Sequence, residues 1–249
     1  MNQYFYDLHI HSCLSPCADD DMTPGNIAGM AAIKGLNLLA LTDHNTAKNC
    51  PAFFKACRQM GIVPVAGMEL STAEDVHIIC LFEHLEDAMA FDEEVSKHLA
   101  PIKNRPEIFG NQWILDDQDE IIGEVEELLI SATDLWLDDA LELARRFGAH
   151  VHPAHIDRES NGMFAILGGI PEEYGFHYFE LNDPQNLLEC EKHIPKSQRA
   201  DFLFCSDAHH LWDINEAEHS LLLDDEPYSS SLVRKRLFES FLKQEGSNV

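Results

Sequence analysis

The chain has 249 residues, of which 45% are hydrophobic, so it can bury one sizeable core. Its formal net charge is -27, from 44 acidic and 17 basic residues, which argues against a surface that follows the backbone of a long nucleic acid. A small phosphorylated substrate is not excluded, because divalent metal ions can make one pocket locally positive.

The N-terminal sequence and the cysteine content favour a cytoplasmic protein. The N-terminus lacks a basic segment followed by an apolar one, and no apolar run approaches the roughly 18 residues of a membrane span. The seven cysteines are scattered, and Cys80 and Cys205 lie inside strand-like runs, so we expect reduced thiols. Cys13 and Cys17 form a single pair, which is a weak zinc signal.

Short apolar runs alternate along the chain with segments of helical periodicity. Thr23 and Pro24 predict the start of the first helix, and Gly61 and Gly148 predict the ends of two later ones. Strands that alternate with helices favour a mostly parallel sheet or a barrel of the α/β class. The predicted strands are residues 4–9, 36–41, 62–66, 76–82, 149–152, 178–181 and 202–205, and the predicted helices are residues 23–33, 47–60, 83–99, 134–147 and 231–242.

Two regions interrupt this alternation. Residues 101–129 contain two short apolar runs around an acidic turn, which predicts a β-hairpin inserted before the helix at 134–147. Residues 213–230 are acidic and rich in turn residues, and they precede the last helix. Because no Pro/Gly/Ser-rich linker divides the chain, we expect one domain over residues 1–249 that carries the hairpin as an insertion.

Histidines and carboxylates occur mostly at the predicted strand ends. His9 and His11 are two residues apart, so on a strand both imidazoles face one side and can grip one ion. Asp7 shares that side and is a candidate to orient one of these rings. The following acidic run, Asp19-Asp20-Asp21, is either a source of ligands or a solvated turn before a helix N-terminus.

The next two strands end in further candidate ligands. Asp43 and His44 follow the second predicted strand, and Glu69 follows the third. A carboxylate such as Glu69 can bridge two metal ions. His77 lies inside the apolar run 76–82, where it is either a ligand or a core histidine with satisfied hydrogen bonds. Beside the other clusters we favour the ligand.

The later strand ends complete the set. His150, His152 and His155 crowd one end, and we favour His155 because Pro153 breaks the strand before it; His152 is the competitor. Asp207 and His209 repeat the two-residue spacing. Brought together at the strand ends, these clusters predict a site for two or three divalent metal ions. Ligation by nitrogen and oxygen alone suits Zn, Mn or Fe. The remaining histidines are predicted to lie on the surface: His84, His98, His177, His193, His210 and His219.

In this order, the motifs resemble those of the PHP (polymerase and histidinol phosphatase) superfamily over about residues 4–210. The resemblance implies a distorted, TIM-like (β/α)7 barrel with a di- or trinuclear metal site at the C-terminal strand ends. It also implies a metal-dependent phosphoesterase. The matching positions are His9, His11, Asp19, His44, Glu69, His77, His155, Asp207 and His209.

The resemblance also implies how these residues divide among three metal ions. The first ion would be held by His9, His11, Glu69 and Asp207, and the second by Glu69, His77 and His155. The third would take His44, His209 and an acid from the loop. Asp19 is our choice for that acid because it lies four residues before Thr23, although Asp20 and Asp21 remain alternatives.

The expected chemistry is in-line attack on a phosphoester by metal-bound hydroxide. We predict Glu69, His209 and Arg158 as catalytic residues, with Arg158 as a phosphate clamp; the alternative for Arg158 is a surface ion pair with Asp157 or Glu159. The expected substrate is a small phosphorylated metabolite or nucleotide. Two alternatives stay open, an exonuclease for short oligonucleotides and a metal-dependent binding module without turnover. The sequence does not predict the oligomeric state.

Overall fold

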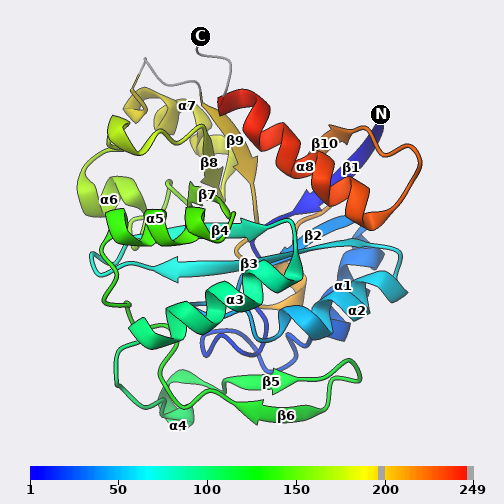
Figure 1. Cartoon of the computed structure of the whole chain (residues 1–249), viewed down its shortest axis with the longest axis vertical. Helices are drawn as coiled ribbons and strands as arrows, with labels where there is room; N and C mark the ends of the chain where they lie inside the picture. The colour runs from blue at the N-terminus through cyan, green and yellow to red at the C-terminus, as the bar shows by residue number, and fades with distance from the viewer. Residues whose placement is uncertain (196–199, 246–249) are drawn as a thin grey trace.

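The computed structural model describes residues 1–195 and 200–245 and forms a mixed α/β domain (Figure 1). Its main sheet has the strand order β10-β1-β2-β3-β4-β7. A separate parallel pair, β8 and β9, continues the curve of this sheet, because β8 lies beside β7 and Ile10 bridges to Ala208. The strands are β1 (Asn2–Asp7), β2 (Leu38–Leu41), β3 (Val63–Ser71), β4 (His77–Phe82), β7 (His150–Pro153), β8 (Tyr178–Leu181), β9 (Asp201–Phe204) and β10 (Ser220–Leu223).

The predicted fold class is confirmed, since the curled sheet is a distorted and incompletely closed TIM-like barrel. The expectation of a mostly parallel sheet is wrong at β4, which runs antiparallel to both β3 and β7. The reason is the short connection at residues 72–76, which makes a hairpin, whereas a parallel neighbour needs a longer crossover. β10 was not predicted; it pairs antiparallel with β1 from within the acidic region 213–230.

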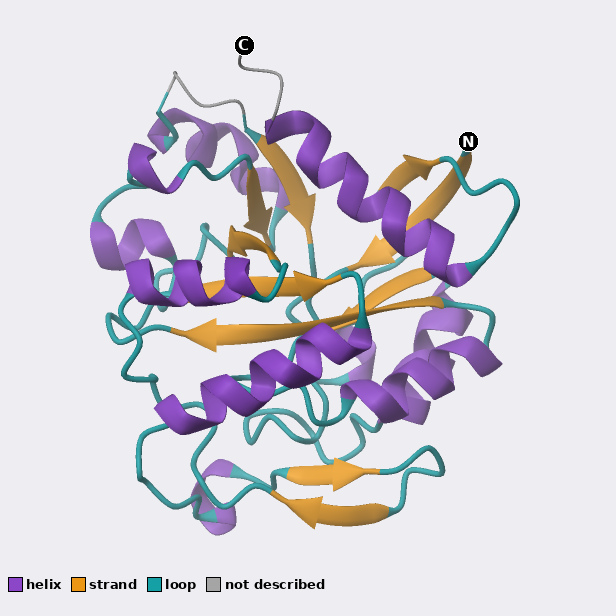
Figure 2. Cartoon of the chain, viewed as in Figure 1, coloured by secondary structure: helices purple, strands orange, loops and turns teal. Residues whose placement is uncertain are grey.

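The helices lie around this sheet (Figure 2). Thr23 caps the first one as predicted, because its side-chain oxygen accepts a hydrogen bond from the Asn26 N–H at 3.2 Å. The longer helices are α1 (Pro24–Lys34), α2 (Cys50–Gln59), α3 (Leu85–Val95), α5 (Leu137–Arg146) and α8 (Ser230–Glu245). The short ones are α4 (Pro106–Phe109), α6 (Met163–Leu167), α7 (Leu187–Cys190), and the 3-10 turns η1 (Ser96–His98), η2 (Glu172–Tyr174), η3 (Pro184–Asn186), η4 (Glu191–His193) and η5 (Leu211–Asp213).

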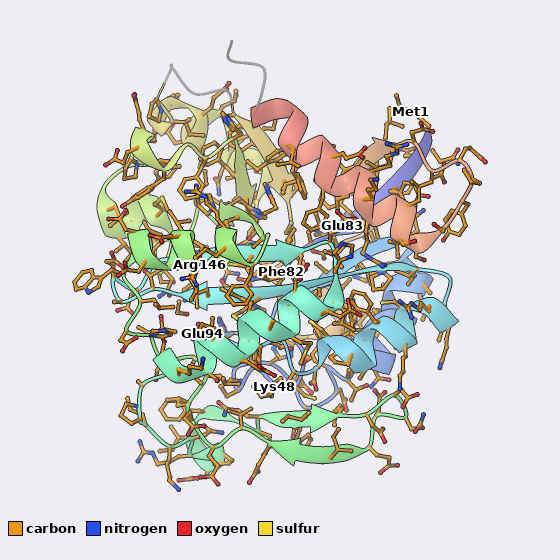
Figure 3. All side chains as sticks on the ribbon, viewed as in Figure 1. Met1, Lys48, Phe82, Glu83, Glu94 and Arg146 are labelled. Atoms are coloured by element: carbon orange, nitrogen blue, oxygen red, sulfur yellow. The ribbon has the colours of Figure 1, made fainter. Side chains whose placement is uncertain are left out.

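Alternate residues of the strands face two separate hydrophobic clusters. In β2, Leu39 packs with the helices outside the sheet, whereas Leu38 packs with the apolar face of α8, including Phe241. On the outer side, the Phe82 ring lies 5.2 Å from that of Phe91 in α3, at the position labelled in Figure 3. One side of the curled sheet is therefore covered by the apolar face of α8.

The inserted hairpin forms β5 (Trp113–Leu115) and β6 (Ile121–Glu124), which lie apart from the main sheet (Figure 1). It packs against the loop that follows β1, where the Trp113 N–H donates to the Cys13 carbonyl at 3.2 Å. All seven cysteines are free thiols, and Cys80 and Cys205 are buried. Within the described residues, no helix has the length and apolar character needed to cross a membrane.

Candidate metal centre

The segment after β1 brings the first two histidines into the interior. His9 and His11 lie just beyond β1 and not on it. Backbone hydrogen bonds hold this segment against the end of β9, from Asp207 N–H to the His9 carbonyl and from His11 N–H to the Ala208 carbonyl, both at 3.0 Å. The two Nε2 atoms lie 3.0 Å apart in the fully buried interior, so both imidazoles point to one place.

Glu69 lies at the centre of the cluster, within β3, and its carboxylate is buried. Its Oε1 atom is 2.7 Å from His77 Nδ1 and 3.0 Å from His155 Nε2. Its Oε2 atom is 2.9 Å from His44 Nδ1 and 3.2 Å from His11 Nε2. One carboxylate thus faces imidazoles on both of its oxygens, which is the arrangement that a bridging ligand requires.

Asp207 supplies the second carboxylate. Its Oδ1 atom lies 2.9 Å from His11 Nε2 and 3.2 Å from His9 Nε2, and its Oδ2 atom lies 2.6 Å from Arg158 Nη1. The Arg158 side chain is 43% exposed, so its guanidinium lies at the boundary between the cluster and solvent. The two surface ion pairs considered for Arg158 are therefore not the contact it makes in this structure.

Among the residues that the structure describes, three groups of ligand atoms have a spacing that could hold metal ions, with all atoms of a group within 4.8 Å of one another. Glu69 Oε2, His44 Nδ1 and Asp207 Oδ1 are buried and make no hydrogen bond within the described part of the chain. Bound cations would satisfy these atoms, so the donor set fits divalent metal ions. The groups are His9, His11, Glu69 and Asp207; His44, Glu69 and His77; and His11, His44 and His209.

The protonation states suit this role. Burial lowers the pKa of His44 to about 4 and that of His209 to about 3, so both rings are neutral near pH 7 and carry a free lone pair. Burial would raise the pKa of Glu69, but the neighbouring imidazoles, His77 and His9 foremost, hold it well below its usual range. Glu69 is therefore an ionised carboxylate in the buried cluster.

The sequence left a choice at β7, and the structure places the three histidines there differently. His155 lies beyond the strand with φ at +24° and joins the cluster through Glu69. His152 lies behind the cluster, with its Nε2 atom 3.8 Å from Glu180 Oε2, and His150 stacks on Phe241 with ring centroids 3.8 Å apart. None of the three belongs to the groups above, but only His155 contacts a residue of those groups that could bridge two ions, Glu69. His155 therefore stays the predicted ligand at this strand end.

The acidic loop residues are not brought into the cluster. Asp19 is half exposed and lies 3.5 Å from His210 Nδ1, and the Asp20 carboxylate accepts hydrogen bonds from Asn111. Asp21 is exposed. Asp19 as a third-metal ligand therefore stays a prediction that this arrangement does not support.

Two polar residues have roles that differ from the sequence-based expectation. Asp7 orients no imidazole; its carboxylate accepts the backbone N–H groups of Ser206 and Asn215 and holds two loops together. Glu180 was missed, although it contacts the His9 ring at 2.7 Å. The available signal was a single carboxylate inside the apolar strand Tyr178–Leu181. His219, expected at the surface, is half buried and stacks on Phe204.

A family model for the PHP domain matches residues 7–159, which is more than half of the chain and includes most of the cluster. The chain belongs to the PHP domain family. A curated relative, a 5'-3' exoribonuclease of Haemophilus influenzae, is 35% identical to it over 79 residues. That match covers 30% of this chain and 28% of the exoribonuclease.

Solved structures share the fold of this PHP domain. The lesion-specific endonuclease PfuEndoQ from Pyrococcus furiosus aligns with a TM-score of 0.65 at 18% identity, over 98% of this chain and 57% of the endonuclease. A proposed metal-dependent phosphoesterase from Bifidobacterium adolescentis aligns with a TM-score of 0.55 at 16% identity, over 93% and 95% of the two chains. At these identities the likeness establishes the fold alone.

Proposed function

We propose that this PHP domain is a metal-dependent phosphoesterase that hydrolyses a small phosphorylated metabolite or nucleotide. The observation that carries the proposal is the Glu69 carboxylate, which faces imidazoles on both oxygens beside the Asp207–Arg158 pair. The chain thus combines ligands for more than one cation with a guanidinium at the rim. A phosphoryl group needs both, because its charge must be neutralised and its oxygens oriented.

We assign the ligands as follows. His9, His11, Glu69 and Asp207 would hold one ion, and Glu69, His77 and His155 a second. Because His11 serves the first ion, a third would be left with His44 and His209 from the described cluster. When bound, zinc, manganese or iron would activate water and neutralise charge on the phosphoryl oxygens.

His209 suits a ligand better than a proton donor. Its Nδ1–H donates to the Asp207 carbonyl at 2.8 Å, which leaves Nε2 with a free lone pair. Its side chain is 22% exposed, and burial lowers its pKa to about 3, so the ring carries no second proton to donate near pH 7. Proton donation to the leaving group is therefore not assigned to His209.

A second candidate function is cleavage of short oligonucleotides. The exoribonuclease relative and the fold shared with a DNA endonuclease favour it. The net charge of -27 argues against tracking a long polymer. Activity on a short RNA that survives rising salt would support this candidate, since phosphate-tracking binders lose affinity steeply with salt.

The test of the proposed function is elemental analysis of bound metal, run beside hydrolysis of generic phosphomonoesters and phosphodiesters with added manganese or zinc. Two or three metal ions per chain with turnover would support a phosphoesterase and would show which ester type to pursue. Metal ions without turnover on any ester would instead favour a binding module. Well-folded protein that binds no metal would overturn the centre itself.

Arg158→Ala is expected to raise KM for a phosphorylated substrate about tenfold, since a charge-assisted contact to phosphate contributes about 1.5 kcal/mol or more. The metal content should not change, because Asp207 keeps its contacts to His9 and His11. Arg145→Ala is the matched control, as Arg145 is exposed and, in the part of the chain that the structure describes, donates to the Tyr174 carbonyl, away from the cluster. Steady-state kinetics of both variants give the result, and an unchanged KM in Arg158→Ala would remove Arg158 from the site.

Metal affinity is expected to rise with pH. Burial lowers the pKa of His11, but the carboxylates of Asp207 and Glu69, which lie 2.9 and 3.2 Å from its Nε2 atom, outweigh burial and raise it to about 9 in the metal-free protein. A metal ion must displace this proton, so His11 alone should weaken apparent affinity about tenfold for each pH unit below about 9. Competition with a chelator at several pH values between about 6 and 9 measures the slope; a flat profile would contradict a protonated His11.

A further inference from the structure

The side of the His9 ring that faces away from the cluster is held by a buried acid. His9 Nδ1 donates to Glu180 Oε1 at 2.7 Å, while His9 Nε2 faces Asp207 at 3.2 Å. Both the ring and the Glu180 carboxylate are fully buried. A hydrogen bond at Nδ1 fixes which nitrogen carries the proton, so Nε2 is the nitrogen presented to the cluster.

Glu180 also holds a second part of the site. The same oxygen, Oε1, accepts the backbone N–H of His155 at 3.1 Å, so one atom positions the His9 ring and the chain that carries His155. The other oxygen, Oε2, makes no hydrogen bond within the described residues, and His152 Nε2 lies 3.8 Å from it. His152 therefore lies next to this oxygen but is too far away to donate a hydrogen bond to it.

The Nδ1 atom of His11 is also fixed by a buried acid, but the contact runs through the hydroxyl of Ser15. Ser15 Oγ lies 3.0 Å from His11 Nδ1 and donates its own proton to Asp43 Oδ1 at 2.7 Å. Because that proton is committed to Asp43, the serine oxygen accepts from His11 Nδ1–H. Asp43 is fixed in turn by the N–H and hydroxyl of Ser12, both at 2.7 Å. His11 Nε2 is thereby left to face Glu69 and Asp207.

We propose that Glu180, and Asp43 acting through Ser15, are positioning residues that fix His9 and His11 as Nε2 ligands of the first metal ion. We expect Glu180 to have the larger effect on metal affinity, because it contacts the His9 ring directly and also accepts the backbone N–H of His155. A carboxylate behind a ligating imidazole raises its basicity and fixes its orientation. The inference rests on the metal centre of the proposed function, but it does not depend on which ester is hydrolysed or on turnover.

The test uses Glu180→Gln and Ser15→Ala with Asp92→Asn as the matched control. Asp92 is also a buried carboxylate, bonded to Thr46 and paired with Lys48 at 2.6 Å (Lys48 is labelled in Figure 3), and it contacts no residue of the cluster. Zinc affinity is measured by chelator competition on the full chain. We expect a 10- to 100-fold loss in Glu180→Gln, a loss of about tenfold in Ser15→Ala, and none in Asp92→Asn.

A spectroscopic readout and a second variant separate an effect on ring position from an effect on protein stability. The histidine ¹⁵N resonances of the zinc-loaded wild type should show Nε2 ligation by His9 with a protected Nδ1 proton. This proton should be less protected in Glu180→Gln, because an amide oxygen is a weaker acceptor than a carboxylate. If Glu180→Gln does not fold, Ser15→Ala tests the same idea at His11. Its readout is the protection of the His11 Nδ1 proton, because the hydroxyl that it removes also accepts the His44 backbone N–H at 3.1 Å. Unchanged zinc affinity in both variants, or a loss no larger than in Asp92→Asn, would overturn the proposal. Zinc binding without hydrolysis in the wild type would overturn the proposed function and leave this comparison intact.

Discussion

Replacement of Glu69 by glutamine is expected to remove hydrolysis almost completely and to release at least one metal ion per chain. Both carboxylate oxygens face imidazoles, Oε1 towards His77 and Oε2 towards His44, and an amide cannot offer two anionic oxygens to two cations. A loss on the order of 1000-fold in kcat/KM corresponds to about 4 kcal/mol of transition-state stabilisation.

The control for this variant is Glu74→Gln, because within the described residues the Glu74 carboxylate accepts a hydrogen bond from the Leu137 N–H at the start of α5 and none from the cluster. Metal content by elemental analysis and kcat/KM should both match the wild type in the control. Glu69→Gln with full metal content and activity within about tenfold of the wild type would refute a bridging role for Glu69.

Gly110→Ala is expected to loosen the inserted hairpin from the loop that follows the first two histidines. Gly110 has φ at +100°, and a Cβ atom at this position would lie 2.1 Å from the Pro16 carbonyl oxygen. Because that oxygen belongs to the backbone, either the hairpin or the loop after His11 must move. We expect a loss of about 2–4 kcal/mol in the free energy of unfolding, from backbone strain and steric overlap together.

Gly148→Ala separates the two causes. Gly148 has φ at +76°, and an added Cβ atom would meet no other atom within 4 Å. Alanine there introduces backbone strain without steric overlap, so we expect a loss of about 1 kcal/mol in the free energy of unfolding. Denaturant unfolding of the metal-free variants gives both values. Zinc affinity should fall in Gly110→Ala and not in Gly148→Ala, since Gly110 lies against the loop after His11 and Gly148 does not. Equal losses of stability in the two variants would show that the contact with Pro16 is unimportant.

Much of this protein can be predicted from the order of its residues. Alternating apolar runs and helical segments indicate an α/β barrel, because side-chain period and chain punctuation are local properties. The spacing of His9 and His11, and of Asp207 and His209, places pairs of donors at strand exits, which is again local. The hairpin insertion and the Thr23 cap follow from turn and capping chemistry in the same way.

Other features depend on contacts between segments far apart in sequence. The reversed direction of β4 puts His77 at the start of its strand, and this is how a histidine in an apolar run reaches Glu69. Arg158 meets Asp207 and not its sequence neighbours, because the loops after β7 and β9 converge.

Glu180 and Asp19 show most clearly what sequence alone can and cannot predict about the site. Glu180 is one carboxylate in a four-residue apolar strand, and its role exists only because β8 lies next to the segment that carries His9. Asp19, in contrast, has a suitable position in the sequence but lies at the surface beside His210. Sequence by itself determined which donor types stand at the strand ends, since that follows from local periodicity. The tertiary structure decided which of them face one another, because burial and the closing of the curled sheet select donors by distance in space and not along the chain.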